Sequence, residues 1–531
     1  MSKKSILIIL FSVLSVMVTQ ISEAAVIDVT TTQDNVPGSL RAAITTANNN
    51  GEDNTIYLPS GVYIHIGAAD EDANVGGDLD IDTGRKLTII GQGKNKTFID
   101  GNSIDRVLHI LKGTVYISDL TIRKGKAPNG LGLGWGIAMS GGGIYNCGNL
   151  TLTRCVIKNN AAGIGGDAGN IGASDGGGHG GGIYNEGELT LDNCTITNNR
   201  AGNGGDNNDT ERPGNGGGGG GIWNSGILTL NNCTITGNSA GNGGNTDNNL
   251  STGDGGHGGG IINTNTLNMD NCTISYNKAG DGGICDCPDH GDLGFGGGIY
   301  NTGNLTMSGC TVNDNVSISH YYGFGIGGGI YNGAYLTLTN CTISGNIAGI
   351  VGYAGSNGGG FFNEELIDGG ISLLINTTVV NNIAGGILNY GDIRLINSIV
   401  ANNVVDSGDG PDCVGTFDWV CYSLIADTTD CILTGFQMAN ILGQGPLLGP
   451  LADNGGPTKT HALLPGSPAI DAGNKSGLYT DQRSYKRPIN IPGIPNVSDG
   501  ADIGAYEYIP FSTAGATTYG GSEPKLETVI R

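Results

Sequence analysis

Residues 141–160 read GGGIYNCGNLTLTRCVIKNN, and this phrase returns along most of the chain. The close copies are GGIYNEGELTLDNCTITNN at 181–199, GGIWNSGILTLNNCTITGN at 220–238, GGIINTNTLNMDNCTISYN at 259–277, GGGIYNTGNLTMSGCTVNDN at 296–315 and GGGIYNGAYLTLTNCTISGN at 327–346. Weaker copies occupy 358–382 and 385–403. Every insert lies between the end of one phrase and the next GGG. A solenoid predicts this pattern, because its loops leave one corner of each coil.

Two residue types keep the same place in these copies. The first column is Asn146, Asn185, Asn224, Asn263, Asn301, Asn332, Asn363 and Asn389. Nine residues after an Asn of this column comes Cys155, Cys194, Cys233, Cys272, Cys310 or Cys341, and five residues later another Asn follows. In the last two copies Thr377 and Ser398 take the Cys place. We expect equivalent side chains to stack along one axis, with the Asn amides hydrogen-bonded to each other.

The shortest repeat, from Thr377 to Ser398, is 21 residues long and holds three short strands of the types IYN, LTL and CTI. Three strands in so short a unit cannot pair with each other. They must pair in parallel with the same strands of neighbouring units, about 4.8 Å away. Leu150 and Leu152 would face inward and Thr151 outward. The sequence therefore predicts an all-β fold, a right-handed parallel β-helix.

The ends of the chain differ from the repeat. Residues 1–25 have two lysines, an apolar run and small residues, which predicts a signal peptide; the alternative, a membrane anchor, usually needs about 18 or more apolar residues. Residues 26–60 are expected to be an N-terminal cap with a short helix that begins after Ser39. Residues 61–440 would form the β-helix with glycine-rich loop insertions, 441–508 a C-terminal cap module and 509–531 a polar tail.

The charge of the chain limits its partners. The formal net charge is −23, and removal of residues 1–25 leaves −24. Such a chain should repel nucleic acid and anionic lipid. After loss of the signal peptide no stretch is long enough to span a membrane, so we expect a secreted or outer cell-surface protein.

Eleven of the twelve cysteines fall into two groups. Neighbours in the Cys column would have parallel Cβ atoms about 4.8 Å apart, outside the roughly 3.5–4.5 Å that a disulfide favours. We expect these six to be buried free thiols that pack as small apolar residues. An exported protein does form disulfides. The candidates outside the column are Cys285, Cys287, Cys413, Cys421 and Cys431.

The inserts are rich in Gly, Asn and Asp. They resemble calcium-binding repeats but lack a tandem nine-residue period. Weak calcium binding by Asp206, Asp209, Asp247 and Asp254 is a hypothesis, and no other cofactor is expected.

Catalytic residues are not evident in the repeat. A glycoside hydrolase needs paired carboxylates on adjacent coils, whereas Asp192 and Asp270 lie two coils apart. His179 and His257 share a register, with Gly218 between them, and are interpreted as solvated loop residues. The outward threonine columns allow ice binding, although exposed threonine is common in strands.

Two segments resemble known families. DNGGPTKTHALLPGSPAIDAG at 453–473 and DIGAYE at 502–507 resemble the choice-of-anchor (type Q) C-terminal region of exported β-helix proteins. GSLRAAI at 38–44 resembles the CSLREA-type N-terminal motif, with Gly38 in place of its Cys and Ala42 in place of its Glu. The GGGIYN phrase is similar to repeats of polymorphic outer membrane proteins. These resemblances imply a surface or secreted location, an adhesive or structural role and no shared catalytic residues.

The sequence thus predicts a non-enzymatic secreted or cell-surface protein that binds cell-surface glycans or proteins. The alternative is a polysaccharide lyase or glycoside hydrolase on a β-helix scaffold, although that idea rests on fold analogy. A second alternative is a calcium- or ice-binding surface protein.

Overall fold

The computed structural model describes residues 24–510, except for 70–72, 133–135, 169–171, 208–211, 248–250, 286–290, 320–324, 351–356, 366–369, 406–407 and 410. Nearly all of the predicted signal peptide, most of the predicted tail, Asp209 and Cys287 lie outside the described residues.

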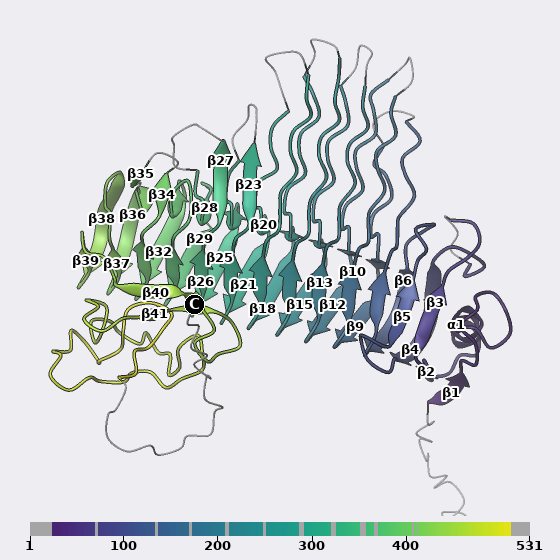
Figure 1. Ribbon diagram of the computed structural model, residues 1–531, viewed down its shortest axis with the longest axis horizontal. Coiled ribbons are helices and arrows are strands. Elements are labelled where there is room, and N and C mark those ends of the chain that lie inside the picture. Colours follow the sequence, from purple (N-terminus) through teal and green to yellow (C-terminus); the bar gives the residue numbers. More distant parts are fainter. Residues whose placement is uncertain are drawn as a thin grey trace, which may run out of the picture.

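The described chain is a right-handed parallel β-helix, which confirms the predicted fold (Figure 1). One coil consists of β11 (Ile183–Asn185), β12 (Glu188–Asp192) and β13 (Thr195–Thr197). Each strand pairs in parallel with its equivalent in the coils before and after, so that Ile183 lies between Ile144 and Ile222. Equivalent residues of the phrase therefore lie directly above one another.

The strands form three columns. The first comprises β8 (Ile144–Asn146), β11, β14 (Ile222–Asn224), β17 (Ile261–Asn263), β20 (Ile299–Asn301), β24 (Ile330–Asn332), β28 (Phe361–Asn363) and β31 (Ile387–Asn389). The second comprises β1 (Ala25–Asp28), β2 (Asn54–Tyr57), β9 (Asn149–Thr153), β12, β15 (Ile227–Asn231), β18 (Thr266–Asp270), β21 (Asn304–Ser308), β25 (Tyr335–Thr339), β29 (Ile371–Ile375) and β32 (Asp392–Ile396). The long strands β4 (Leu79–Ile90), β6 (Leu108–Ser118), β36 (Cys413–Cys421) and β38 (Cys431–Met438) run through both columns and join them into one sheet.

The third column is a separate sheet. It comprises β3 (Gly61–Ile64), β5 (Thr97–Asp100), β7 (Thr121–Arg123), β10 (Val156–Lys158), β13, β16 (Thr234–Thr236), β19 (Thr273–Ser275), β22 (Thr311–Asn313), β26 (Thr342–Ser344), β30 (Thr378–Val380), β33 (Ile399–Ala401), β37 (Leu424–Ile425) and β39 (Ile441–Leu442). The remaining strands form short pairs: β23 (Val316–Ser319) with β27 (Ile347–Ile350), β34 (Val404–Val405) with β35 (Gly408–Asp409), and β40 (Leu448–Ala452) with β41 (Thr460–Leu463).

Asparagine forms both the corners and the internal ladders of the coil. Asn193 and Asn198 bracket β13 and have φ values of 53° and 54°, a left-handed conformation that Asn tolerates better than most residues. Asn185 and Asn199 are buried instead and extend the two ladders. In the first ladder the Asn146 amide donates to Asn185 Oδ1 at 2.7 Å. The inward Ile, Leu and Cys side chains fill one continuous core between the sheets.

The N-terminal cap contains the predicted helix. Helix α1 (Leu40–Asn49) begins after Ser39, whose side chain accepts a hydrogen bond from the main-chain N–H of Ala42. Its buried face includes Ile44 and Ala47. The β-helix begins before residue 61, because β1 pairs with β2 and β2 pairs with β4 within the same sheet.

The glycine-rich inserts build an ordered wall, which we define as 163–178, 202–217, 241–256 and 280–294 without the residues that are not described. Its extended segments rise side by side from one edge of the coil (Figure 1). Gly202 N–H donates to Gly178 O, and Gly241 N–H donates to Gly217 O, each at 2.8 Å. These bonds link neighbouring inserts through their backbones. The sequence analysis described these segments only as loop insertions.

The C-terminal module packs on the flank of the coil, against the third strand column (Figure 1). Gln482 bridges two coils, because its amide donates to Thr311 Oγ1 at 3.0 Å and its oxygen accepts from Thr342 Oγ1 at 2.6 Å. Ser344 Oγ lies 2.9 Å from His461 Nε2. The module therefore buries outward strand residues whose equivalents in earlier coils are partly exposed.

Candidate functional site

A column of aromatic side chains runs along the outer face of the first strand column. The middle residue of each IYN strand points away from the core, and parallel register places these residues over one another. The members are Asp80, His109, Tyr145, Tyr184, Trp223, Ile262, Tyr300, Tyr331 and Phe362. Ring centroids are 4.9 Å apart for Tyr145 and Tyr184 and 4.7 Å apart for Tyr300 and Tyr331. We call this set the aromatic column.

A second column lies beside it at the base of the wall. It contains His179, Gly218, His257 and Phe295, each four residues before the Ile of its coil. His179 stacks on Trp223 with ring centroids 4.0 Å apart, and His257 stacks on Tyr300 at 4.5 Å. The interpretation of these histidines as solvated loop residues is therefore wrong. Parallel stacking of the coils carries their rings onto the aromatic column.

Hydrogen bonds and burial hold both histidines neutral. His179 Nδ1 accepts from the main-chain N–H of Gly218 at 3.0 Å, and His257 Nδ1 accepts from that of Phe295 at 2.9 Å. These bonds leave the ring proton on Nε2. Burial lowers the pKa of each ring to about 4. At neutral pH the two imidazoles thus present an uncharged aromatic face with one N–H donor.

A cleft opens where both columns are interrupted. Gly218 provides no ring in the second column, and Ile262 replaces the ring of the aromatic column in the next coil. The cleft has a volume of about 420 Å³. Its apolar and aromatic lining consists of His179, Trp223, His257, Ile262, Phe295 and Tyr300. Two stacked ring pairs therefore lie around a hollow that is wide enough for a sugar-sized ligand.

Acidic and amide side chains from the wall form the polar side of the cleft. Asn215, Asp254 and Asp292 line it from three successive coils. The side chain of Asn215 accepts from the main-chain N–H of Asp254 at 2.9 Å, and Asp254 accepts from that of Asp292 at 3.0 Å. Asp254 also pairs with Arg212 at 3.0 Å. The sequence analysis did not single out Asp292, although its spacing of 38 residues from Asp254 matches the coil period.

Of the four acids proposed to bind calcium, Asp206, Asp247 and Asp254 belong to the described residues. Asp206 accepts a hydrogen bond from the main-chain N–H of Asn245 at 2.7 Å. Asp254 belongs to the cleft, and Asp247 is exposed. Within the described residues, three metal-ligating side chains come together only at Asp78, Asp80 and His109.

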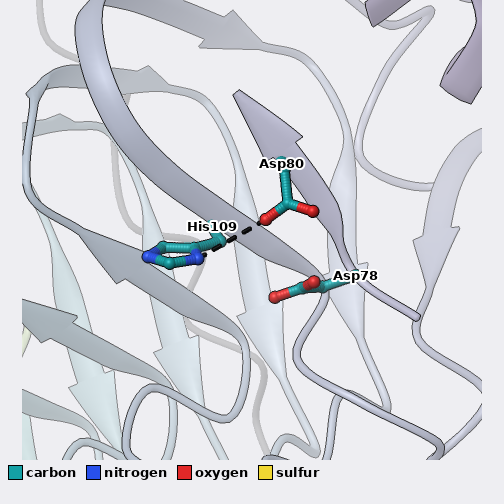
Figure 2. A group of neighbouring side chains, drawn as sticks. All are labelled: Asp78, Asp80 and His109. Atoms are coloured by element: carbon teal, nitrogen blue, oxygen red, sulfur yellow. Dashed lines mark ion pairs between the residues drawn. The ribbon is translucent and has the colours of Figure 1, made fainter. Parts of the chain in front are cut away.

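That group lies at the N-terminal end of the aromatic column. Figure 2 shows its three side chains: Asp80 is on β4, Asp78 directly precedes that strand, and His109 is on β6. His109 Nδ1 lies 3.4 Å from an oxygen of Asp80, and Asp78 pairs with Arg106 at 2.8 Å. Burial raises the pKa of Asp78 to about 7, with Asp105 and Asp80 adding to the rise while Arg106 opposes it.

The described cysteines are either free thiols or disulfide-bonded. The column thiols Cys155, Cys194, Cys233, Cys272, Cys310 and Cys341 are free and buried. Cys413 and Cys431 form a disulfide with Cα atoms 5.3 Å apart. Cys285 is also disulfide-bonded.

Cys421, a disulfide candidate, is instead a free buried thiol. It ends β36 opposite Ile396, inside the sheet, while Cys413 at the start of that strand takes Cys431 as its partner.

Comparisons with known proteins give structural neighbours only. No family model and no curated protein sequence matches the chain. A pectate lyase structure is 12% identical with a TM-score of 0.35, and the alignment covers 91% of this chain and 95% of the other. The catalytic domain of Agl-KA is 12% identical with a TM-score of 0.32, covering 79% and 68%. The A-module of the mannuronan C-5 epimerase from Azotobacter vinelandii is 13% identical with a TM-score of 0.26, covering 76% and 94%.

Function is therefore argued from this chain's own residues. Among the described residues, no helix is both long and apolar enough to cross a membrane.

Proposed function

We propose that this protein is a secreted or cell-surface glycan-binding β-helix whose ligand lies in the cleft beside the aromatic column. The observation that carries the proposal is the interruption of both ring columns at Gly218 and Ile262, with stacked rings on either side. The C–H face of a sugar packs against aromatic rings, and its hydroxyl groups need acceptors such as the carboxylates of Asp254 and Asp292. The resemblance of 453–473 to exported choice-of-anchor proteins supports the location.

The charge of the cleft selects the kind of sugar. No Lys or Arg lines the cleft within the described residues, and the nearby Arg212 is paired with Asp254. The chain as a whole carries a formal charge of −23. A polyuronate would be repelled by both the local and the overall field. The favoured ligand is therefore a neutral glycan or an amino-sugar polymer.

Titration calorimetry of the full-length protein with cellohexaose, chitohexaose and a polygalacturonate oligomer tests this proposal. We expect heat with one of the first two ligands and none with the polyuronate. Trp223→Ala and Tyr300→Ala should each weaken binding at least tenfold. The matched control is Tyr335→Ala, an exposed tyrosine of β25 outside the cleft lining. Binding that all three variants retain would contradict the proposal.

Hydrolysis of the bound glycan is the second candidate function, favoured by one observation. Asp254 and Asp292 lie on adjacent coils and line the same cleft, as a pair of glycosidase carboxylates would. An assay for new reducing ends with the oligosaccharide that binds tests it. Asp292→Asn should abolish product formation and leave binding within a few-fold if the pair is catalytic. Binding without product would leave the protein as a glycan-binding module.

A further inference from the structure

The end of the aromatic column carries an independent site. Its last two members, His109 and Asp80, are not aromatic partners for a sugar. With Asp78 they place one imidazole nitrogen and two carboxylate oxygens within 4.8 Å of one another. All three residues are buried: the exposed fractions are 0% for Asp78, 1% for Asp80 and 8% for His109.

One oxygen of each carboxylate is already held in place. Arg106 Nε donates to Asp78 Oδ2 at 2.8 Å, and the main-chain N–H of Asn74 donates to Asp80 Oδ2 at 2.9 Å. The other oxygen of Asp78, Oδ1, is buried and has no hydrogen-bond partner, and Asp80 Oδ1 lies 3.4 Å from His109 Nδ1 without a hydrogen bond. A buried acceptor without a partner is costly, and each such atom in a folded protein requires an explanation.

The local charge also favours a cation. Asp78 and Asp80 bring two carboxylates together at a buried site, where Asp78 pairs with Arg106 and Asp80 faces His109. The nearby Arg41 is paired with Asp34 at 3.0 Å. A divalent cation between the two carboxylates would offset their mutual repulsion.

We infer that Asp78, Asp80 and His109 form a binding site for one divalent transition-metal ion such as Zn²⁺ or Mn²⁺. The imidazole favours such an ion over Ca²⁺ or Mg²⁺, which prefer oxygen ligands. The bonds from Arg106 and Asn74 orient the carboxylates as outer partners do in metal sites.

The ion would join two parts of the fold. Its carboxylate ligands lie at the start of β4, Asp80 within the strand and Asp78 directly before it, and its imidazole ligand is on β6 of the next coil. Asn74, which positions Asp80, also donates to the main-chain oxygen of Arg41 in α1 at 3.1 Å. A bound ion therefore braces the first coils against the capping helix. This inference stands apart from glycan binding, because it uses different residues and a different readout.

Metal content of the full-length protein tests the inference. The protein carries Cys147→Ser, because the exposed Cys147 thiol beside Glu186 could bind Zn²⁺ by itself. After EDTA treatment, incubation with Zn²⁺ and gel filtration, we expect one ion per chain by mass spectrometry and a rise in Tm of several degrees. Ca²⁺ at the same concentration should give neither.

Variants in the same background locate the ion. Asp80→Asn and His109→Gln should each lose the bound Zn²⁺ and the rise in Tm, whereas Asp206→Asn, an exposed acid of the wall, should keep both. Circular dichroism shows whether each variant folds. If Asp80→Asn does not fold, an anomalous difference peak in Zn²⁺-soaked crystals of the parent decides. A peak elsewhere, no bound ion, or equal Zn²⁺ content in all variants overturns the inference.

Discussion

Asn238 Oδ1 accepts two hydrogen bonds from Asn199, one from its main-chain N–H and one from its amide, both at 3.0 Å. The amide of Asn238 in turn donates to Asn277 Oδ1 and to the carbonyl of Ile196, also at 3.0 Å. A single side chain thus links three successive coils. Because it is buried, water cannot replace these bonds.

Asn238→Ala should lower the free energy of unfolding by about 2–4 kcal/mol, because it leaves two donors of Asn199 and the acceptor of Ile196 buried without partners. Denaturant titration followed by circular dichroism measures the change. The control, Asn149→Ala, removes an exposed Asn that bonds only Glu188 and should cost less than about 0.5 kcal/mol. Equal losses of stability in the two variants would show that an Asn of the ladder stabilises the protein no more than an exposed Asn does.

The coil could be predicted because its signal is carried by side chains at fixed offsets. Asn146 and Cys155 recur with a constant separation of nine residues, and their columns follow once the coils are stacked in register. The wall lacks this kind of signal, because its contacts join backbones. Its trace in the sequence is a glycine period: Gly163, Gly202 and Gly241 are 39 residues apart.

The cleft was missed for a related reason. His179, Gly218 and His257 share one register in the sequence, but the sequence does not show which side chains lie beside them. The stacking partner of His179 is Trp223, which belongs to the IYN phrase. That phrase indicates a strand but not what its outward residue contacts. The two columns form a site because the glycine turn between them brings them side by side. Glycine has no side chain, so this turn leaves no side-chain pattern in the sequence.

The wall gives a second prediction. A Cβ added at Gly241 would lie 1.7 Å from the carbonyl oxygen of Gly202, and a backbone atom cannot rotate away. Gly241→Ala should therefore separate the inserts while the coil beneath stays folded. We expect faster proteolysis within 241–256 and little change in far-ultraviolet circular dichroism. Gly445→Ala, where a Cβ meets nothing within 4 Å, is the control. Equal protease resistance of the two variants would contradict the packed wall.

The cleft histidines predict a pH dependence of stability. Their folded pKa of about 4 lies below the ordinary value of 6.5, so the unfolded chain binds protons first as the pH falls. The stability they contribute is complete above pH 6.5 and is lost between pH 6.5 and 4, by roughly 3 kcal/mol for each residue. Phe295 shows that a phenyl ring fits this column.

The double variant His179→Phe/His257→Phe should therefore lose less stability than the parent protein between pH 6.5 and 4. Denaturant midpoints at several pH values measure the difference, and the parent serves as reference because all other groups are shared. If the stability of the two proteins changed in the same way with pH, protonation of the two histidines would not destabilise the folded state.

The reactivity of the Cys147 thiol tests the effect of Glu186 on the surface next to the aromatic column. Burial, together with the Glu186 carboxylate, raises the pKa of its thiol to about 11. At pH 8 it should react with a disulfide reagent far more slowly than a free cysteine, because the thiolate is the nucleophile. Glu186→Gln should speed the reaction several-fold, and Glu188→Gln, on the next strand, should not. Equal rates for both variants would remove Glu186 as a cause.

The last prediction fills the cleft instead of dismantling it. Gly218→His together with Ile262→Tyr restores the residue types found in neighbouring coils. A Cβ at Gly218 would lie 2.2 Å from Ile262 Cδ1, the mobile end of a side chain that the second substitution replaces, and 2.9 Å from the main-chain oxygen of His257, which must move slightly. New stacking on Trp223 and Tyr300 should keep or raise stability, by about 0.5–1.5 kcal/mol for each ring pair.

Glycan binding by this double variant should be lost, because two added rings occupy the hollow between the existing ones. Calorimetry with the oligosaccharide that binds the parent protein measures it. The combination of lost binding and undiminished stability separates this variant from Trp223→Ala, which removes packing as well as the ligand surface. If the filled variant still bound the glycan with the parent affinity, the ligand would have to lie elsewhere on the coil, and the interruption at Gly218 would be an irregularity of the repeat without a role in recognition.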